Sequence, residues 1–164
     1  MAQITFKSNS AAETLKTGRS IGKVILGGTI LTLEGDLGSG KTLFVKGLAQ
    51  GLKISQEITS PTFALIQIYH GGLELYHVDL YRLNEKEILE LGLEDCWRNR
   101  VPTQPQNWAL AIEWGNKAKA IFPKEKSIAI LQLNFKILSK YSRNIKIEGP
   151  LECLKKIQTS LQKS

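Results

Sequence analysis

GDLGSGKT, residues 35–42, fits the phosphate-binding pattern G-x-x-x-x-G-K-[ST] at every fixed position. The run before it, residues 29–34, reads as a buried strand, and residues 43–52 after it continue as a helix. A loop in this setting surrounds phosphate oxygens with backbone N–H groups, and the helix N-terminus adds partial positive charge. The stretch therefore predicts an α/β fold built around a phosphate-binding loop.

Each fixed residue of this loop has a chemical reason to be present. Gly35, Gly38 and Gly40 allow positive φ angles and a close approach of the backbone to a phosphate. The pattern implies that Lys41 reaches the β- and γ-phosphates and that the Thr42 hydroxyl ligates Mg²⁺. The simpler alternative is a glycine-rich turn, which the strand and helix on either side disfavour.

Length and composition are typical of a globular protein. With 164 residues, of which 42% are hydrophobic and 23% charged, residues 1–164 are predicted to form a single domain. We find neither a membrane-length apolar run nor a secretory signal, so we expect a cytoplasmic protein without membrane attachment. Cys96 and Cys153 lack metal-ligand spacing, which favours ordinary thiols in a reducing compartment.

The net charge of +7 fits a protein that works near RNA, but it also fits an ordinary solvated surface. Much of the excess lies late in the chain, at Lys117, Lys119, Lys124, Lys126, Lys136, Lys140, Arg143, Lys146, Lys155, Lys156 and Lys163. Because these cations are spread out, without interleaved aromatic residues, we interpret them as a solvated face rather than a nucleic-acid site.

Hydrophobic patterning and turn residues predict alternating strands and helices. Strands are expected at residues 3–7, 29–34, 64–69, 73–78, 108–112, 128–135 and 144–148. Helices are expected from an N-cap at Ser10 to about residue 24, at 43–52, 85–91, 93–97 and 116–122, and from residue 151 onward, with a polar loop at 101–107. Gly71-Gly72 predicts a hairpin. The fold class is therefore α/β, a three-layer sandwich with a mixed central sheet.

Two carboxylates follow predicted strands. Glu113 ends the apolar run 108–112, and Asp79 ends the run 73–78. Phosphoryl transfer requires carboxylates that hold Mg²⁺ and orient water or an acceptor. We therefore interpret both as metal or water ligands; the alternative is a solvated or capping loop carboxylate.

Three neighbours of these acids leave alternatives open. His77 could carry a proton or serve as a hydrogen-bonded structural imidazole. Arg82 could neutralise phosphate charge or form a surface ion pair. Trp114 could stack on a base or partner, or pack in the core.

Taken together, the motifs resemble those of one family. In order they are GDLGSGKT, SPTFALIQIY (60–69), HVDLYRL (77–83), IEW (112–114) and Pro123. This set resembles the TsaE family, also known as YjeE, over roughly residues 10–123. The resemblance implies a P-loop NTPase-like domain that binds ATP and Mg²⁺ and hydrolyses ATP slowly alone. It implies a role in bacterial threonylcarbamoyladenosine modification of tRNA, beside the anticodon, with the partner proteins TsaB and TsaD.

The resemblance also carries residue roles. It implies that Gly38, Ser39, Gly40, Lys41 and Thr42 hold phosphates, that Thr42 and Glu113 ligate Mg²⁺, and that Asp79 is important for hydrolysis. It implies a nucleotide-responsive switch loop at Ser60, Pro61, Thr62 and Phe63, and adenine contacts from Ser10 to Thr14. The catalytic set is then Lys41, Asp79 and Glu113. Gly115 replaces a proline found in many members. An indirect or weak contact with tRNA stays open.

Two other functions compete with an ATPase. A small-molecule kinase would need a lid, for which Arg98 and Arg100 are the plausible cations. A nucleotide-dependent interaction module would share the same site without physiological turnover. A GTPase is disfavoured because the N-K-x-D guanine motif is absent from the sequence.

Overall fold

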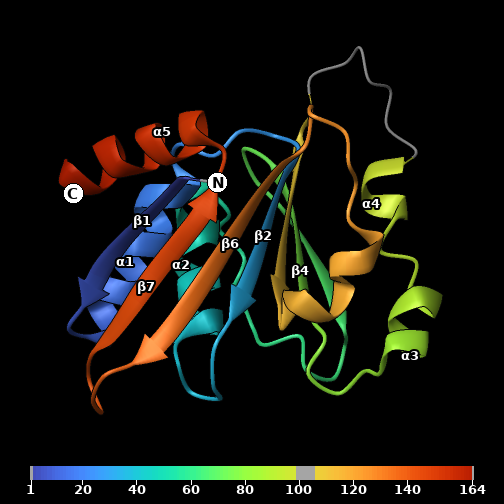
Figure 1. The fold of residues 1–164 in the computed structure, drawn as a ribbon, viewed down its shortest axis with the longest axis horizontal. Coiled ribbons are helices and arrows are strands. Elements are labelled where there is room, and N and C mark those ends of the chain that lie inside the picture. The colour runs from blue at the N-terminus through green and yellow to red at the C-terminus, as the bar shows by residue number, and fades with distance from the viewer. Residues whose placement is uncertain (1, 99–105, 164) are drawn as a thin grey trace.

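The computed structural model describes residues 2–98 and 106–163 and contains one seven-stranded sheet with helices on both faces (Figure 1). Its strands are β1 (Ala2–Ser8), β2 (Thr29–Glu34), β3 (Ile66–His70), β4 (Glu74–Asp79), β5 (Trp108–Glu113), β6 (Ala129–Ile137) and β7 (Arg143–Gly149). Its helices are α1 (Ala11–Gly22), α2 (Lys41–Gly51), α3 (Glu85–Glu90), α4 (Asp95–Arg98), the 3₁₀ helix η1 (Gly115–Ile121) and α5 (Leu151–Gln162).

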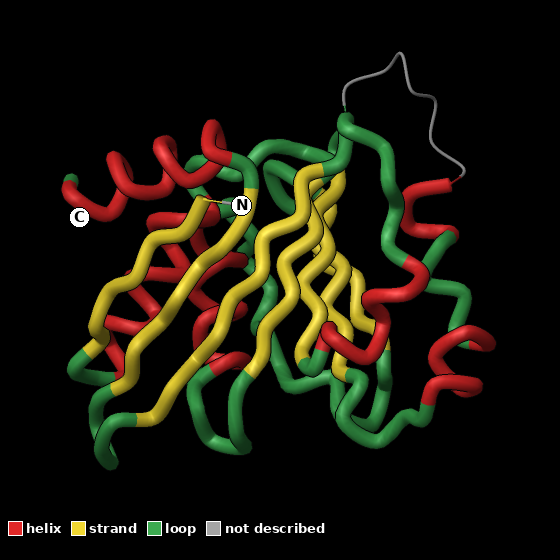
Figure 2. Tube along the Cα trace, in the orientation of Figure 1, coloured by secondary structure: helices red, strands yellow, loops and turns green. Residues whose placement is uncertain are grey.

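The sheet combines parallel and antiparallel pairs, which confirms the predicted mixed sheet. Its strands lie in the order β1-β7-β6-β2-β5-β4-β3 (Figure 2). β2 runs parallel to both β5 and β6, and β4 runs parallel to β5. The remaining pairs, β3–β4, β6–β7 and β1–β7, are antiparallel. The hairpin predicted at Gly71-Gly72 is β3–β4.

Helices cover both faces of this sheet, so the predicted three layers are present. α1, α2 and α5 pack on one face, and α3, α4 and η1 pack on the other (Figure 1). Side chains alternate between the faces: Leu31 and Leu33 point to the first core, and Ile30 points to the second. Burial on both faces explains why the central strands read as continuous apolar runs.

Glycines bring α1 and α2 into backbone contact. A Cβ on Gly18 of α1 would lie 2.2 Å from the Phe44 carbonyl oxygen, and one on Gly47 of α2 would lie 2.0 Å from the Leu15 carbonyl oxygen. Neither position has room for a larger residue. The contact fixes α1 against α2, the helix that follows the phosphate-binding loop.

Most element boundaries agree with the sequence, with local differences. The predicted helix 116–122 is the 3₁₀ helix η1, and α2 begins at Lys41 rather than residue 43. Ser10 Oγ accepts from Glu13 N at 3.1 Å as an N-cap should, but the Glu13 carboxylate accepts from Asn9 N instead of Ser10 N. The predicted loop at 101–107 lies mostly outside the described residues. Within those residues, no helix combines the length and apolar character needed to cross a bilayer.

Candidate functional site

The site lies where three adjacent parallel strands end. The phosphate-binding loop follows β2, and the strand register places Glu113 of β5 beside both Leu33 of β2 and Asp79 of β4. Carboxyl ends of parallel strands are the usual ligand-binding edge of an α/β sheet. A cavity of about 490 Å³ opens at this edge.

Many of the predicted site residues line this cavity, whereas others do not. Those that line it are Gly38, Gly40, Lys41, Thr42, Ser60, Thr62, Asp79 and Glu113. Those that do not are Ser10, Thr14, Gly35, Ser39, Pro61 and Phe63.

The phosphate-binding loop has the backbone conformation expected of its glycines. Gly35, Gly38 and Gly40 have φ angles of 143°, 76° and 103°, which strain any residue with a Cβ. Gly40 is also the N-cap of α2 and has no side chain to cap the first turn. The first amides of α2 are therefore donors suited to an anion at the cavity.

Lys41 is a buried cation held by carbonyl oxygens. Its Nζ donates to the Gly35 oxygen at 2.6 Å and to the Asp36 oxygen at 3.0 Å, and it lies 4.3 Å from the Trp114 ring centroid. Burial lowers the pKa of Lys41, while nearby carboxylates, above all Glu113, oppose this shift. An anion entering the cavity would therefore stabilise the ammonium.

Glu113 connects the loop helix to the sheet. Thr42 Oγ1 donates to Glu113 Oε1 at 2.8 Å, and His77 Nε2 lies 2.9 Å from the same oxygen. His77 is fully buried and does not line the cavity, so its position favours the structural role over proton transfer. A hydroxyl and a carboxylate oxygen so close together are the kind of hard ligands that Mg²⁺ binds.

Asp79 holds the predicted switch loop. Thr62 Oγ1 donates to Asp79 Oδ2 at 2.9 Å, and Ser60 Oγ lies 2.7 Å from Thr62 Oγ1. The other carboxylate oxygen, Oδ1, accepts from Tyr81 N at 2.9 Å. The sequence pattern did not predict this direct contact between the acid and the loop.

Aromatic and cationic side chains form the rim of the cavity. The Arg82 guanidinium lies 4.3 Å from the ring centroid of Phe63, whose side chain is 83% exposed. Trp114 is half-buried with a left-handed backbone (φ 60°), and its ring lies 5.1 Å from that of Tyr81. Arg82 and Trp114 both line the cavity, which favours ligand contact over a surface ion pair for Arg82. Trp114 also packs against the second core, so the structure supports both alternatives for this residue.

Arg143 is a cavity residue that sequence reasoning missed as a site candidate. It is 7% exposed, and its Nη1 donates to Thr14 Oγ1 at 2.9 Å and to the Ser10 oxygen at 3.4 Å. Ser10 and Thr14 thus hold Arg143, whereas Ala11 of the same helix lines the cavity. Within residues 2–98 and 106–163, Arg143 Nε is a buried donor without a partner. An unpaired buried donor beside a cavity suits a ligand acceptor.

Of the two cations proposed for a kinase lid, the structure describes only Arg98. Arg98 pairs with Glu94 at 2.8 Å on α4 and does not line the cavity, and Arg100 lies outside the described residues. Neither Cys96 nor Cys153 takes part in a disulfide. Burial raises the pKa of Cys153, which keeps its thiol protonated.

Comparison with known proteins agrees with this geometry. Residues 8–145 match the family described as threonylcarbamoyl adenosine biosynthesis protein TsaE. A Treponema pallidum (strain Nichols) protein named tRNA threonylcarbamoyladenosine biosynthesis protein TsaE is 42% identical over 118 residues, covering 71% of this chain and 82% of that protein. A Bacillus subtilis (strain 168) protein of the same name is 36% identical over 127 residues, covering 77% and 75%.

A solved structure shares the fold. The crystal structure of Bacillus subtilis YdiB superposes with a TM-score of 0.74 at 29% sequence identity, covering 99% of this chain and 95% of that chain. The similarity therefore extends over nearly the whole sheet and its helices.

Proposed function

Because the chain belongs to the TsaE family, whose members act in threonylcarbamoyladenosine modification of tRNA, we propose that it is a Mg²⁺-dependent ATPase of that pathway. One observation carries the proposal: Lys41, Asp79 and Glu113 meet at one cavity, at the edge where three parallel strands end. In this proposal residues 1–164 act as one ATPase domain in the cytoplasm.

The residues present fit a triphosphate and a magnesium ion. The backbone of Gly38 to Thr42, at the start of α2, offers amide donors, and Lys41 offers a positive charge. Thr42 and Glu113 would hold Mg²⁺, which when bound would offset phosphate charge. Trp114 and Arg82 at the rim would contact other parts of the nucleotide.

The chain's own residues then have separate tasks in hydrolysis. Lys41 would exchange its two carbonyl acceptors for phosphate oxygens and offset their charge. Asp79 would accept a hydrogen bond from the attacking water and align it with the γ-phosphate. His77 would keep the Glu113 carboxylate in place through its 2.9 Å contact. The products are ADP and inorganic phosphate.

TsaB and TsaD are the proposed partners, as the family resemblance implies, with TsaD transferring the threonylcarbamoyl group.

The experiment that tests the function is phosphate release from ATP, with and without the purified TsaB–TsaD pair and tRNA. We expect slow release alone and strong stimulation by the pair. A phosphorylated small molecule in place of free phosphate would indicate a kinase. Nucleotide-dependent partner binding without any release would indicate an interaction module.

Arg143→Gln is expected to weaken ATP binding about tenfold or more, because a charge-assisted hydrogen bond contributes about 1.5–3 kcal/mol. Isothermal titration calorimetry measures the effect. Arg143→Lys should restore little, since lysine keeps the charge but lacks the planar guanidinium whose separate nitrogens can face Thr14 and a ligand. Lys146→Gln, on the same strand and outside the cavity, is the matched control. Unchanged affinity in a folded Arg143→Gln protein would remove Arg143 from the site.

Thr62→Ala is expected to make partner binding insensitive to the nucleotide. The substitution removes the hydroxyl that holds the switch loop to Asp79, so the γ-phosphate could no longer bias that loop through this bond. The measurement is TsaB–TsaD affinity with ATP, with ADP and without nucleotide. Thr59→Ala is the control, because the Thr59 hydroxyl bonds Gln67 at 3.2 Å instead. Equal affinities in all three states of the unmodified protein would contradict the switch.

A further inference from the structure

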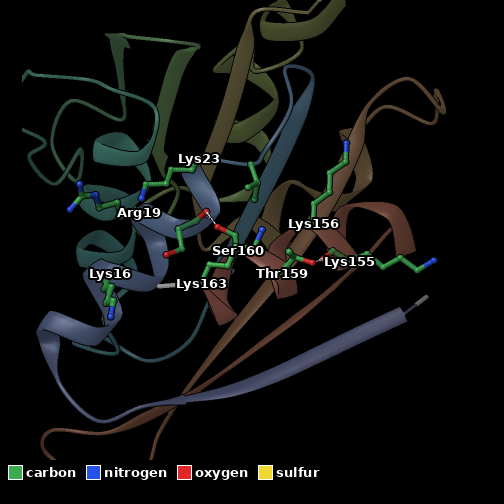
Figure 3. Close-up of a pocket in the computed structure, with 10 residues that line it drawn as sticks. Lys16, Arg19, Lys23, Lys155, Lys156, Thr159, Ser160 and Lys163 are labelled. Atoms are coloured by element: carbon green, nitrogen blue, oxygen red, sulfur yellow. Dashed lines mark hydrogen bonds between the residues drawn. The ribbon is translucent and has the colours of Figure 1, made fainter.

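A basic groove lies between α1 and α5 (Figure 3). Its volume is about 840 Å³, compared with about 490 Å³ for the nucleotide cavity, and the two share no lining residue. Six of its ten lining residues are cations: Lys16, Arg19, Lys23, Lys155, Lys156 and Lys163. The groove is therefore a second candidate ligand site.

The fold gathers these cations from opposite ends of the chain. On α1 they recur at spacings of three and four residues, which places Lys16, Arg19 and Lys23 on one helical face. α5 lies beside that face, where Ser160 Oγ donates to the Ser20 oxygen at 2.8 Å. The cations of the C-terminal part of the chain are spread along the sequence, but Lys155, Lys156 and Lys163 line the same groove as the cations of α1. These three lysines are exposed, as a solvated face requires, but they are not dispersed in space.

No carboxylate lies within this group of cations. No aspartate or glutamate lines the groove, and among the described residues none of the six cations forms an ion pair. Two glutamates lie close by without entering the groove: Glu13 accepts from Asn9 N and borders a small cavity that also touches Lys16, and Glu152 borders another that also touches Lys156. Like charges on neighbouring helix positions destabilise the free protein, so an anionic ligand would stabilise this arrangement.

The rest of the lining indicates which kind of anion fits. Apart from the cations it consists of Ser20, Val24, Thr159 and Ser160. Without an aromatic side chain it offers no platform for unpaired bases, and with one aliphatic residue it lacks the apolar centre of a protein interface. Five of the six cations are lysines, flexible point charges that suit a row of phosphates better than one small anion.

We infer that the α1–α5 groove binds the phosphate backbone of double-helical RNA, such as a stem of the tRNA on which the family's pathway acts. Phosphate contacts of this kind position an RNA without reading its sequence. The inference does not rest on the ATPase proposal, because the groove and the nucleotide cavity share no residue. The family match ends at residue 145, so the α5 half of the groove lies beyond it.

The test compares two charge-reversal variants in binding to a fluorescent, unmodified tRNA transcript. Lys155→Glu/Lys156→Glu changes two exposed residues in the groove, and Lys124→Glu/Lys126→Glu makes the same charge change in the exposed loop after η1. We expect the groove variant to bind at least about tenfold more weakly, with a salt dependence of log Kd that is about two units shallower. The control should bind within about twofold of the unmodified protein, and both variants should keep the ATPase rate.

Three results would overturn the inference. The first is equal loss of tRNA binding in both variants, which would indicate diffuse charge. The second is unchanged binding in the groove variant. The third is competition by single-stranded RNA, or by polyglutamate, as strong as that by an RNA duplex of equal charge. Failure of ATP hydrolysis with groove-dependent tRNA binding intact would contradict only the ATPase proposal.

Discussion

Lys41→Ala is expected to slow the proposed ATP hydrolysis by about 10³-fold or more. Lys41 is the cation buried directly in the phosphate-binding loop, where its Nζ is held by two carbonyl oxygens of that loop. Removing it leaves the developing charge on the phosphates without this compensation in a poorly solvated cavity. ATP binding should weaken too, because the phosphates lose the charge-assisted hydrogen bonds that the Lys41 ammonium would donate. The measurement is the rate of phosphate release at saturating ATP.

Lys46→Ala is the matched control for this variant. Lys46 lies on the same helix but does not line the cavity, so its loss should leave turnover within about twofold, as for most surface changes. An ATPase rate in Lys41→Ala equal to that of Lys46→Ala would exclude Lys41 from catalysis.

Asp79→Ala should also lose turnover by about 10³-fold, but it should keep ATP binding. Asp79 ends β4 and is 5% exposed. A carboxylate has no donor for phosphate oxygens, so removing Asp79 takes no phosphate contact away. A large loss of kcat with little change in the Kd for ATP distinguishes an acid that aligns water from a residue that binds phosphate. Single-turnover hydrolysis and equilibrium ATP binding, measured on the same protein, give the two quantities.

Asp95→Ala provides the comparison, because Asp95 is an exposed acid on α4 away from the cavity. Asp79 also holds Thr62, so Thr62→Ala shows how much of the effect comes from a released loop. If Asp79→Ala hydrolyses ATP as fast as Asp95→Ala does, the proposed role of Asp79 in orienting water is wrong.

The features that could be predicted from the sequence are local ones. The fixed spacing of glycines, lysine and threonine in residues 35–42 determines a loop whose shape depends on few distant contacts. Asp79 and Glu113 could be predicted because a polar residue that ends an apolar strand must lie at an edge of the sheet. The parallel register of β4 and β5 then places the two side by side.

The features that could not be predicted depend on packing between distant segments. Arg143 reaches the cavity because β7 pairs with β1, whose end leads into the helix that carries Thr14. The close α1–α2 contact depends on Gly18 and Gly47, which the sequence presents only as weak positions in two helices. The basic groove likewise requires α1 and α5 to be neighbours, which no spacing within either helix reveals.

The central claim is that the Gly38–Thr42 backbone and Lys41 grip a triphosphate. Calorimetric titration of the purified chain with ATP in the presence of Mg²⁺ tests it most directly, with AMP as the matched ligand that lacks the β- and γ-phosphates. We predict saturable binding of one ATP per chain, much weaker binding of AMP, and loss of the ATP heat in Lys41→Ala. No heat of ATP binding at millimolar concentration, or equal affinity for AMP and ATP, would contradict the account.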